Sequence, residues 1–181
     1  MSLDKNIIEG CIAGNRKAQK VLFDKYKAAM MGVCLRYCKS RDEAEDVLME
    51  AFMTVLSQIR TYRGEGAIDQ WIRRIVVNTS INNYRKNLKH YFHADIENVN
   101  ETEIDEEGNF EIDDKHSVDV ILNAIQQMPD GYRMVLNLYI VEGYKHKEIA
   151  EMLNITIGTS KSQLSKARKI IQEKLSNNGE V

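Results

Sequence analysis

Arginine and asparagine side chains repeat along one side of a helix that the sequence predicts over about residues 68–85. An apolar stripe marks the buried side of this helix and includes Ile68, Trp71, Ile72 and Ile75. The other side carries, at steps of three and four, Arg73, Arg74, Val77, Asn78, Ile81, Asn82 and Arg85. Arginine and asparagine hold hydrogen-bond donors in fixed geometry, which suits phosphate oxygens and base edges. The pattern indicates a nucleic-acid surface, with an ordinary solvated helix face as the alternative.

A second candidate surface lies near the C-terminus, in YKHKEIAEMLNITIGTSKSQLSKARKIIQEKL. Ile149, Ala150 and Leu153 predict a short helix, residues 154–158 a turn, and the stripe from Leu164 onward a longer basic helix. A short helix, a small residue at the crossing and a tight turn predict a helix-turn-helix. The start and outer face of the second helix, where such a motif meets the major groove, carry Thr159, Ser160, Lys161, Ser162, Gln163, Lys166 and Arg168.

The charge is distributed very unevenly along the 181 residues, although the formal net charge is only −2. Residues 59–93 carry 7 basic and 2 acidic side chains, and residues 143–181 carry 7 basic and 4 acidic ones. Between them, residues 94–119 carry 1 basic and 11 acidic side chains, with few large apolar residues. Low hydrophobicity and self-repulsion predict a mobile linker over residues 93–117. It would separate an N-terminal domain, residues 3–92, from a C-terminal domain, residues 118–177.

The remaining pattern predicts an all-α protein made of two small helical domains. Steps of three and four connect the apolar residues of 21–37 and of 44–59, and Ser40 is the expected N-cap of the second of these helices. Only one proline occurs, which argues against a β-sandwich, and the segment MPDGYR around Pro129 is expected to be a turn. No run of about 18 apolar residues predicts a membrane span. The first residues show no signal-peptide pattern, so a cytoplasmic location is expected.

Metal, cofactor and enzyme chemistry find little support in the sequence. Cys11, Cys34 and Cys38 are an odd number of cysteines and are expected to be reduced and buried. No further cysteine or histidine lies close enough to complete a metal site, and the four histidines have no paired nucleophile. Without a glycine-rich phosphate loop, we expect no cofactor, no small-molecule substrate and no catalysis.

The motifs taken together are more specific than either surface alone. DEAEDVLMEAF, YRGEGAIDQWIRRIVVNTSINNYRK, the acidic segment, MPDGYR and EIAEMLNITIGTSKSQLSKAR follow one another in this order. This order resembles the extracytoplasmic-function sigma factors of bacterial RNA polymerase over about residues 5–176. The resemblance implies a two-domain initiation factor that binds core RNA polymerase and promoter DNA and has no catalysis of its own. An anti-sigma factor is a further partner that it implies.

The resemblance also implies which residues do the work. An acidic helix in this family docks on the largest polymerase subunit, and the matching positions here are Asp42, Asp46, Met49 and Glu50. Phe52 also matches, although its spacing favours a place in the core. Recognition and melting of the −10 element are implied for Tyr62, Arg63, Arg73, Arg74, Asn78, Asn82 and Arg85. Recognition of the −35 element is implied for Thr159, Lys161, Ser162, Ser165, Lys166 and Arg168.

This sequence departs from the family at some of these positions. Lys161, Gln163 and Lys166 stand where relatives carry arginine, and Ser160 stands where they bury valine. Lysine is a point charge without the bidentate fork that reads guanine, so we expect altered base specificity or more reliance on phosphate contacts. The resemblance also suggests that the acidic linker passes through a basic channel of the polymerase, with an inert tether as the alternative.

Two other functions are weaker interpretations. A free-standing helix-turn-helix regulator would bind a two-fold symmetric operator without polymerase, but residues 1–90 show no heptad repeat and no ligand-like cluster. A calcium loop would need ligands near Glu103, Asp105, Glu107 and Asp114, and both the residue types and the absence of a preceding amphipathic helix argue against it.

Overall fold

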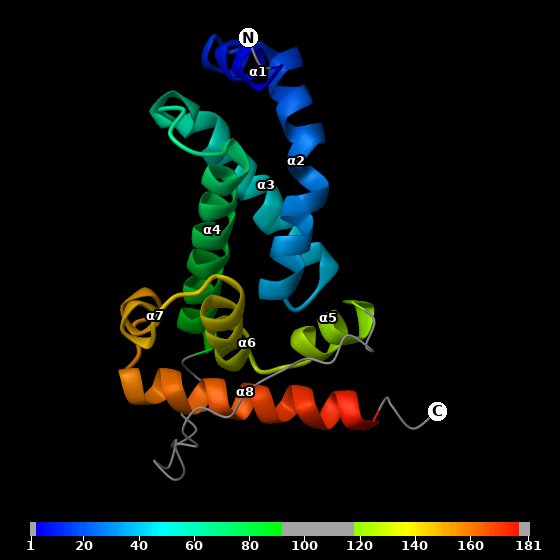
Figure 1. Ribbon diagram of the computed structural model, residues 1–181, viewed down its shortest axis with the longest axis vertical. Helices are drawn as coiled ribbons and strands as arrows, with labels where there is room; N and C mark the ends of the chain where they lie inside the picture. Colours follow the sequence, from blue (N-terminus) through cyan, green and yellow to red (C-terminus); the bar gives the residue numbers. More distant parts are fainter. Residues whose placement is uncertain (1–2, 92–117, 178–181) are drawn as a thin grey trace. The chain divides into compact units, whose positions relative to one another are not determined.

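The computed structural model describes residues 3–91 and 118–177, and both ranges are built from helices without a β-strand (Figure 1). The all-α prediction is therefore confirmed for these residues. The chain divides into two compact units, Met1–Asn83 and Tyr84–Val181, and the boundary falls within helix α4. The acidic segment that the sequence assigns to a linker, together with the calcium-loop candidate inside it, lies outside the described residues.

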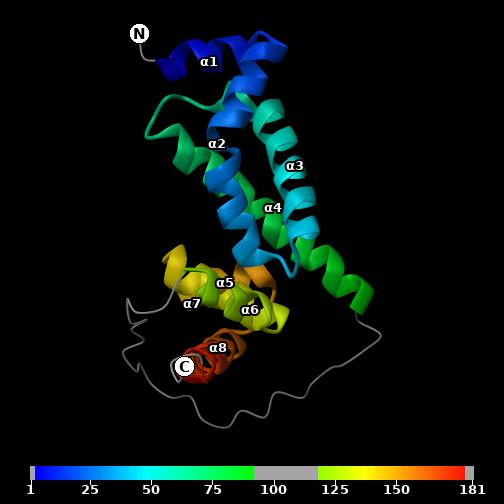
Figure 2. The same cartoon turned by 90° about the vertical axis from the view of Figure 1, so that its right-hand side faces the viewer.

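The first unit contains α1 (Leu3–Ile12), α2 (Arg16–Tyr37), α3 (Arg41–Gln58), the short 3₁₀ helix η1 (Ile59–Thr61) and the first part of α4 (Ile68–Tyr91). Helices α2, α3 and α4 lie side by side, and α1 crosses the end at which α2 begins (Figure 2). The Arg60 guanidinium of η1 donates a hydrogen bond of 3.2 Å to the carbonyl oxygen of Ile12, which connects the end of α1 to the end of α3.

Side chains at the helix starts explain where α2 and α3 begin. The Asn15 carboxamide oxygen accepts hydrogen bonds from the backbone N–H groups of Lys17 and Ala18 at the start of α2. At α3, the Ser40 hydroxyl accepts from the Glu43 N–H at 3.2 Å, and the Glu43 carboxylate accepts from the Lys39 N–H at 2.8 Å. The hydrogen bond to its hydroxyl confirms Ser40 as the N-cap, and the Glu43 carboxylate adds a hydrogen bond to the residue before it.

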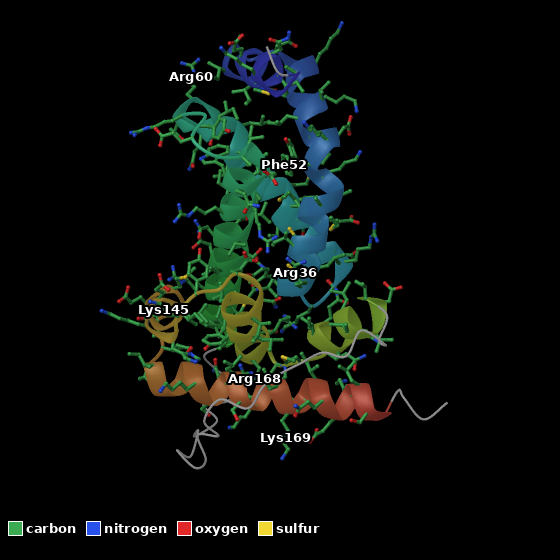
Figure 3. All side chains as sticks on the ribbon, in the orientation of Figure 1. Arg36, Phe52, Arg60, Lys145, Arg168 and Lys169 are labelled. Carbon is green, nitrogen blue, oxygen red and sulfur yellow. The ribbon has the colours of Figure 1, made fainter. Side chains whose placement is uncertain are left out.

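Aromatic and sulfur side chains join the aliphatic residues in the interior of the first unit. Phe52 lies inside the first unit (Figure 3) and is buried. Its ring meets that of Phe23 edge to face, with centroids 4.9 Å apart. Cys11, Cys34 and Cys38 are buried thiols, as the sequence predicts. Burial raises the pKa of the Cys34 thiol to about 12.

The second unit contains the end of α4 followed by α5 (Val118–Gln126), α6 (Asp130–Leu136), a π-helical turn η2 (Asn137–Val141), α7 (His146–Leu153) and α8 (Ile157–Asn177). Helices α5, α6 and α7 all pack against the long α8, with α7 near its start and α5 toward its end (Figure 1). The core between them is formed by Met134, Val135, Leu138, Ile149, Leu153, Leu164, Ala167 and Ile171.

The segment around Pro129 corrects a sequence prediction. MPDGYR was expected to be a turn, but α6 begins at Asp130, directly after Pro129, and includes Gly131. A Cβ atom on Gly131 would lie 2.9 Å from the amide nitrogen of Gln163, so the glycine leaves room for the end of that side chain from α8. Arg133 is buried and donates to the carbonyl oxygens of Gln126 and Met128, which completes the connection from α5.

In the described ranges, no helix is both long enough and apolar enough to cross a membrane. Residues 3–91 and 118–177 likewise contain no group of three or more histidine, cysteine and acidic side chains that could hold a metal ion.

Candidate nucleic-acid interface

The polar face of α4 is narrower than the sequence predicts. Arg74, Asn78 and Asn82 are exposed and lie one turn apart, whereas Arg73 is half-buried. Val77 and Ile81, which the sequence interpretation placed on the same face, are only 2% and 3% exposed, so that assignment is wrong. Each lies about 100° around the helix from the exposed asparagine that follows it, toward the apolar side.

The loop that precedes α4 has a fixed shape. Gly64 and Gly66 have φ of 75° and 83°, values that side-chain-bearing residues rarely adopt. The Tyr62 hydroxyl donates a hydrogen bond of 2.9 Å to the carbonyl oxygen of Gly66 and closes the loop. The Tyr62 ring also contacts the ring of Trp71, with centroids 5.6 Å apart. Trp71 is half-buried beneath Tyr62, and Arg63 is exposed on the loop.

A recess of about 550 Å³ opens beside this loop. Its loop side is formed by Tyr62, Arg63, Gly64, Gly66, Ala67, Ile68 and Asp69. Its other side is formed by Lys5, Ile8 and Glu9 of α1 and by Tyr26 of α2. The sequence analysis missed these four residues because α1 and α2 lie about 40 to 60 positions from the loop and carry no motif that points to it.

Helix α3 presents a different kind of surface, in which acidic and methionine side chains share one face. Asp42, Asp46 and Glu50 are exposed at steps of four residues. Met49 is 54% exposed and Met53 is 71% exposed, one turn apart on the same side. The sequence analysis named Met49 but missed Met53, although their i, i+4 spacing outside the apolar stripe was a usable signal. Phe52 is a core residue, as its spacing indicates.

Helices α7 and α8 form the predicted helix-turn-helix. Asn154 ends α7 in the left-handed conformation with φ of 56°, which asparagine tolerates better than most residues. The Thr156 hydroxyl then accepts a hydrogen bond of 3.0 Å from the Thr159 N–H and caps the start of α8. The Thr159 hydroxyl itself lies 2.8 Å from that of Thr156, so this predicted DNA contact is also part of the helix cap.

The remaining predicted residues of α8 differ in exposure. Lys161 and Lys166 are exposed, and Ser162, Ser165 and Arg168 are half-buried. Ser160 is fully buried, and Gln163 lies against Gly131, so neither belongs to the outer face on which the sequence analysis placed it. Lys169 was missed; it is exposed and points away from the body of the unit (Figure 3). The Lys166 ammonium is 6.0 Å from the Tyr132 ring centroid, at the edge of the cation–π range.

Comparison with known proteins assigns both units. Residues 22–89 match the family "Sigma-70 region 2", and residues 119–171 match "Sigma-70, region 4". An ECF RNA polymerase sigma-E factor of Haemophilus influenzae is 28% identical over 95% of both chains. The RNA polymerase sigma-H factor of Pseudomonas aeruginosa is 27% identical over 95% of this chain and 93% of the relative. The chain belongs to the extracytoplasmic-function sigma factors. It is an alternative sigma factor that directs the initiation of transcription.

A solved structure supports the fold of this sigma factor. The sigma factor RpoE of Bartonella quintana, solved in complex with the anti-sigma factor NepR, is 20% identical, with a TM-score of 0.50 over 87% of this chain and 96% of that one. The region 2 match spans α2 to α4 and so carries the candidate surfaces of α3 and α4, and the region 4 match spans α5 to α8 and carries that of α8. Helix α1 of the sigma factor precedes the region 2 match, although it lines the recess.

Proposed function

We propose that this sigma factor binds core RNA polymerase through α3 and recognises promoter DNA at two places, the −10 element with residues 3–92 and the −35 element with residues 118–177. The observation that carries the proposal is the exposed polar face of Arg74, Asn78 and Asn82 on α4, the helix whose first residues line the recess at loop 62–67. A helix face with hydrogen-bond donors can follow an unpaired DNA strand, and a recess lined by aromatic residues can take up one of its bases.

At the −10 element, the cost to be offset is the unstacking and unpairing of a base, a few kcal/mol. The recess has room for a base, and it is lined by the rings of Tyr62 and Tyr26, on which a base stacks favourably. Arg63, Arg73 and Arg74 supply positive charge for the phosphates, and Asn78 and Asn82 supply amide groups for base edges. Arg85, which the sequence also predicted here, belongs to the second unit and donates a hydrogen bond to the carbonyl oxygen of Met152 in α7. Melting then results from stabilising the single strand, because the chain itself carries out no chemical step.

At the −35 element, the DNA remains a duplex. Helix α8 would enter the major groove with its exposed side, on which Lys161, Ser162, Ser165 and Lys166 meet base edges or phosphates. Lys169 extends the same basic surface by one turn, and Arg168 and Thr159 lie at its margins. Because lysine supplies a point charge, much of this contact would be to phosphates, so binding would depend strongly on salt.

Binding to the polymerase uses the α3 face formed by Asp42, Asp46, Met49, Glu50 and Met53. The carboxylates complement a basic partner surface, and the two exposed methionines supply apolar area that adapts to the partner's shape. Because a solved sigma factor of similar fold is held by an anti-sigma factor, we also propose that a protein of that class binds this chain. The chain would act as a non-catalytic subunit in the cytoplasm.

The decisive test is transcription with purified core polymerase. Core enzyme mixed with the full chain should start transcripts at a small set of sites in genomic DNA, and core enzyme alone should not. A chain that does not bind core, or that binds core without promoter-specific transcripts, would contradict the proposal. Binding of duplex DNA without polymerase, at a two-fold symmetric site, would instead identify a free-standing regulator.

A further inference from the structure

The start of α8 contains a hydroxyl group that is fully removed from water. Ser160 is 0% exposed, at a position where an apolar side chain would complete the packing between α7 and α8. A hydroxyl in such a place destabilises the fold unless it forms a hydrogen bond. Its partner is the imidazole of His146, whose Nδ1 lies 2.9 Å from the Ser160 Oγ. The first residue of α7 is thus joined directly to the first turn of α8.

The imidazole is held on its other side as well. The His146 ring stacks on the ring of Tyr139 in η2, with centroids 4.6 Å apart and planes 24° from parallel. The Arg168 guanidinium carbon lies 5.9 Å from the centroid of the same tyrosine ring. The contacts therefore run from Ser160 through His146 and Tyr139 to Arg168, and they return to α8 two turns after they left it.

These contacts define how α8 sits on the rest of the helix-turn-helix. Lys161 is the first exposed lysine of α8 and follows Ser160 directly. The position in which Ser160 is held therefore sets the direction in which Lys161 points. We propose that His146 is a positioning residue, which fixes the seat of α8 through Ser160 and Tyr139 and thereby the sequence selectivity of α8 toward duplex DNA. This inference rests on the proposed −35 function of α8.

The charges around His146 make its protonation state matter. Burial lowers the pKa of His146 below its ordinary value, and the positive charges of Lys161 and Arg168 on α8 lower it further. Tyr139 of η2 is the titratable side chain stacked on the ring, and the adjacent charged groups are Lys145, which precedes α7, and Lys147 and Glu148 on α7. The neutral ring is therefore favoured in the folded domain. As the pH falls below the ordinary histidine pKa of about 6.5, protonation of His146 destabilises the arrangement in which its ring contacts Ser160 and Tyr139.

The test uses holoenzyme assembled from core polymerase and the full chain, so that each variant is examined in the complete machine. The probe is a pool of duplex DNA, randomised over about ten base pairs upstream of a fixed, premelted fork, from which the wild-type holoenzyme selects its preferred duplex. Selectivity is the affinity for that duplex divided by the affinity for the unselected pool. The variants are His146→Phe, which retains an aromatic ring, Ser160→Val, and the double variant. Glu151→Gln, an exposed change on α7 outside this group of charges, is the matched control.

Each single variant should lower selectivity about 3- to 10-fold, because one partner of a buried hydrogen bond is lost while the other remains. The double variant should recover to within about 3-fold of wild type, because both polar groups then leave together. The selectivity of the wild type should fall as the pH is lowered from 7.5 to 5.5, whereas the selectivity of His146→Phe should not change over this range. Binding to the premelted fork and to core should be the same in all variants.

The proposal would be overturned if both single variants kept wild-type selectivity. It would also be overturned if the double variant lost selectivity by the product of the two single-variant factors, because the two side chains would then act independently. A wild-type pH profile that His146→Phe leaves unaltered would overturn it as well. If His146→Phe does not fold, Ser160→Val replaces it in the test. Wild-type selectivity of Ser160→Val, or a pH profile equal to that of the wild type, would then overturn the proposal. Failure of the proposed −35 function is a distinct result, because the wild-type holoenzyme would then select no duplex at all.

Discussion

The hydroxyl of Tyr62 donates a hydrogen bond to the carbonyl oxygen of Gly66 across the loop that precedes α4, at 2.9 Å. Two glycines with positive φ allow the chain to turn back on itself at this point, and the tyrosine ring rests against Trp71. The loop wall of the recess is therefore held in place before any DNA arrives. Preorganisation of this kind lowers the conformational cost of binding an unpaired base.

Tyr62→Phe should weaken promoter melting while binding to core polymerase stays the same. The ring still packs on Trp71, but the loop loses a hydrogen bond worth about 1 kcal/mol, so open-complex formation should fall roughly 5-fold. Permanganate reactivity of unpaired thymines measures this directly. Tyr132→Phe is the matched control, since it removes a tyrosine hydroxyl from the second unit. Undiminished melting by Tyr62→Phe would show that the hydrogen bond between Tyr62 and Gly66 has no part in holding DNA.

Asn78→Ala should impair open-complex formation more than binding of closed duplex. Asn78 is exposed at the centre of the α4 face, and loss of its contacts to a base should cost about 1–3 kcal/mol. Comparison of holoenzyme binding to a duplex promoter and to a premelted fork separates the two steps. Asn6→Ala, an exposed change on α1 that does not line the recess, serves as the control. An equal loss on both templates would contradict a role in melting.

Met49→Ser combined with Met53→Ser should weaken binding to core polymerase and leave the fold intact. Both side chains are largely in solvent, so their loss removes little buried area from the free chain, but it removes about 1–2 kcal/mol of interface contact for each. Titration of a labelled chain with core polymerase gives the affinity, and urea unfolding gives the stability. Val21→Ser, at a comparably exposed position on α2, should change neither. Core binding that survives the double change would place the docking surface elsewhere.

Lysine-to-alanine substitutions on α8 should separate phosphate contacts from base contacts. Lys161→Ala and Lys169→Ala should weaken duplex binding for all sequences and reduce the salt slope by about 1 each. Lys166→Ala should cost about 1–3 kcal/mol at a single base pair if this lysine reads a base. The measurement is the affinity of holoenzyme for single-base variants of its selected duplex, over a range of salt concentrations. A uniform loss for Lys166→Ala would make it a phosphate contact as well.

Local features of this sigma factor could be predicted from its sequence. Helices α2, α3, α4, α7 and α8, the Ser40 cap and the core position of Phe52 all follow from residues that lie within a few turns of one another. Helical period and capping chemistry act over such short separations, so a single sequence is enough to reveal them. The basic face of α4 was visible for the same reason, because Arg74, Asn78 and Asn82 repeat every fourth residue.

The tertiary structure decided what depends on residues far apart in the chain. It buried Val77 and Ile81. Both lie at the border between the apolar and the polar side of α4, where the helical period alone does not decide whether a residue is buried. The tertiary structure also brought Lys5, Ile8 and Glu9 of α1 to the recess, and it paired Ser160 with His146, fourteen positions away. Such contacts are set by how whole helices pack, and packing depends on all the side chains between two elements rather than on any local pattern.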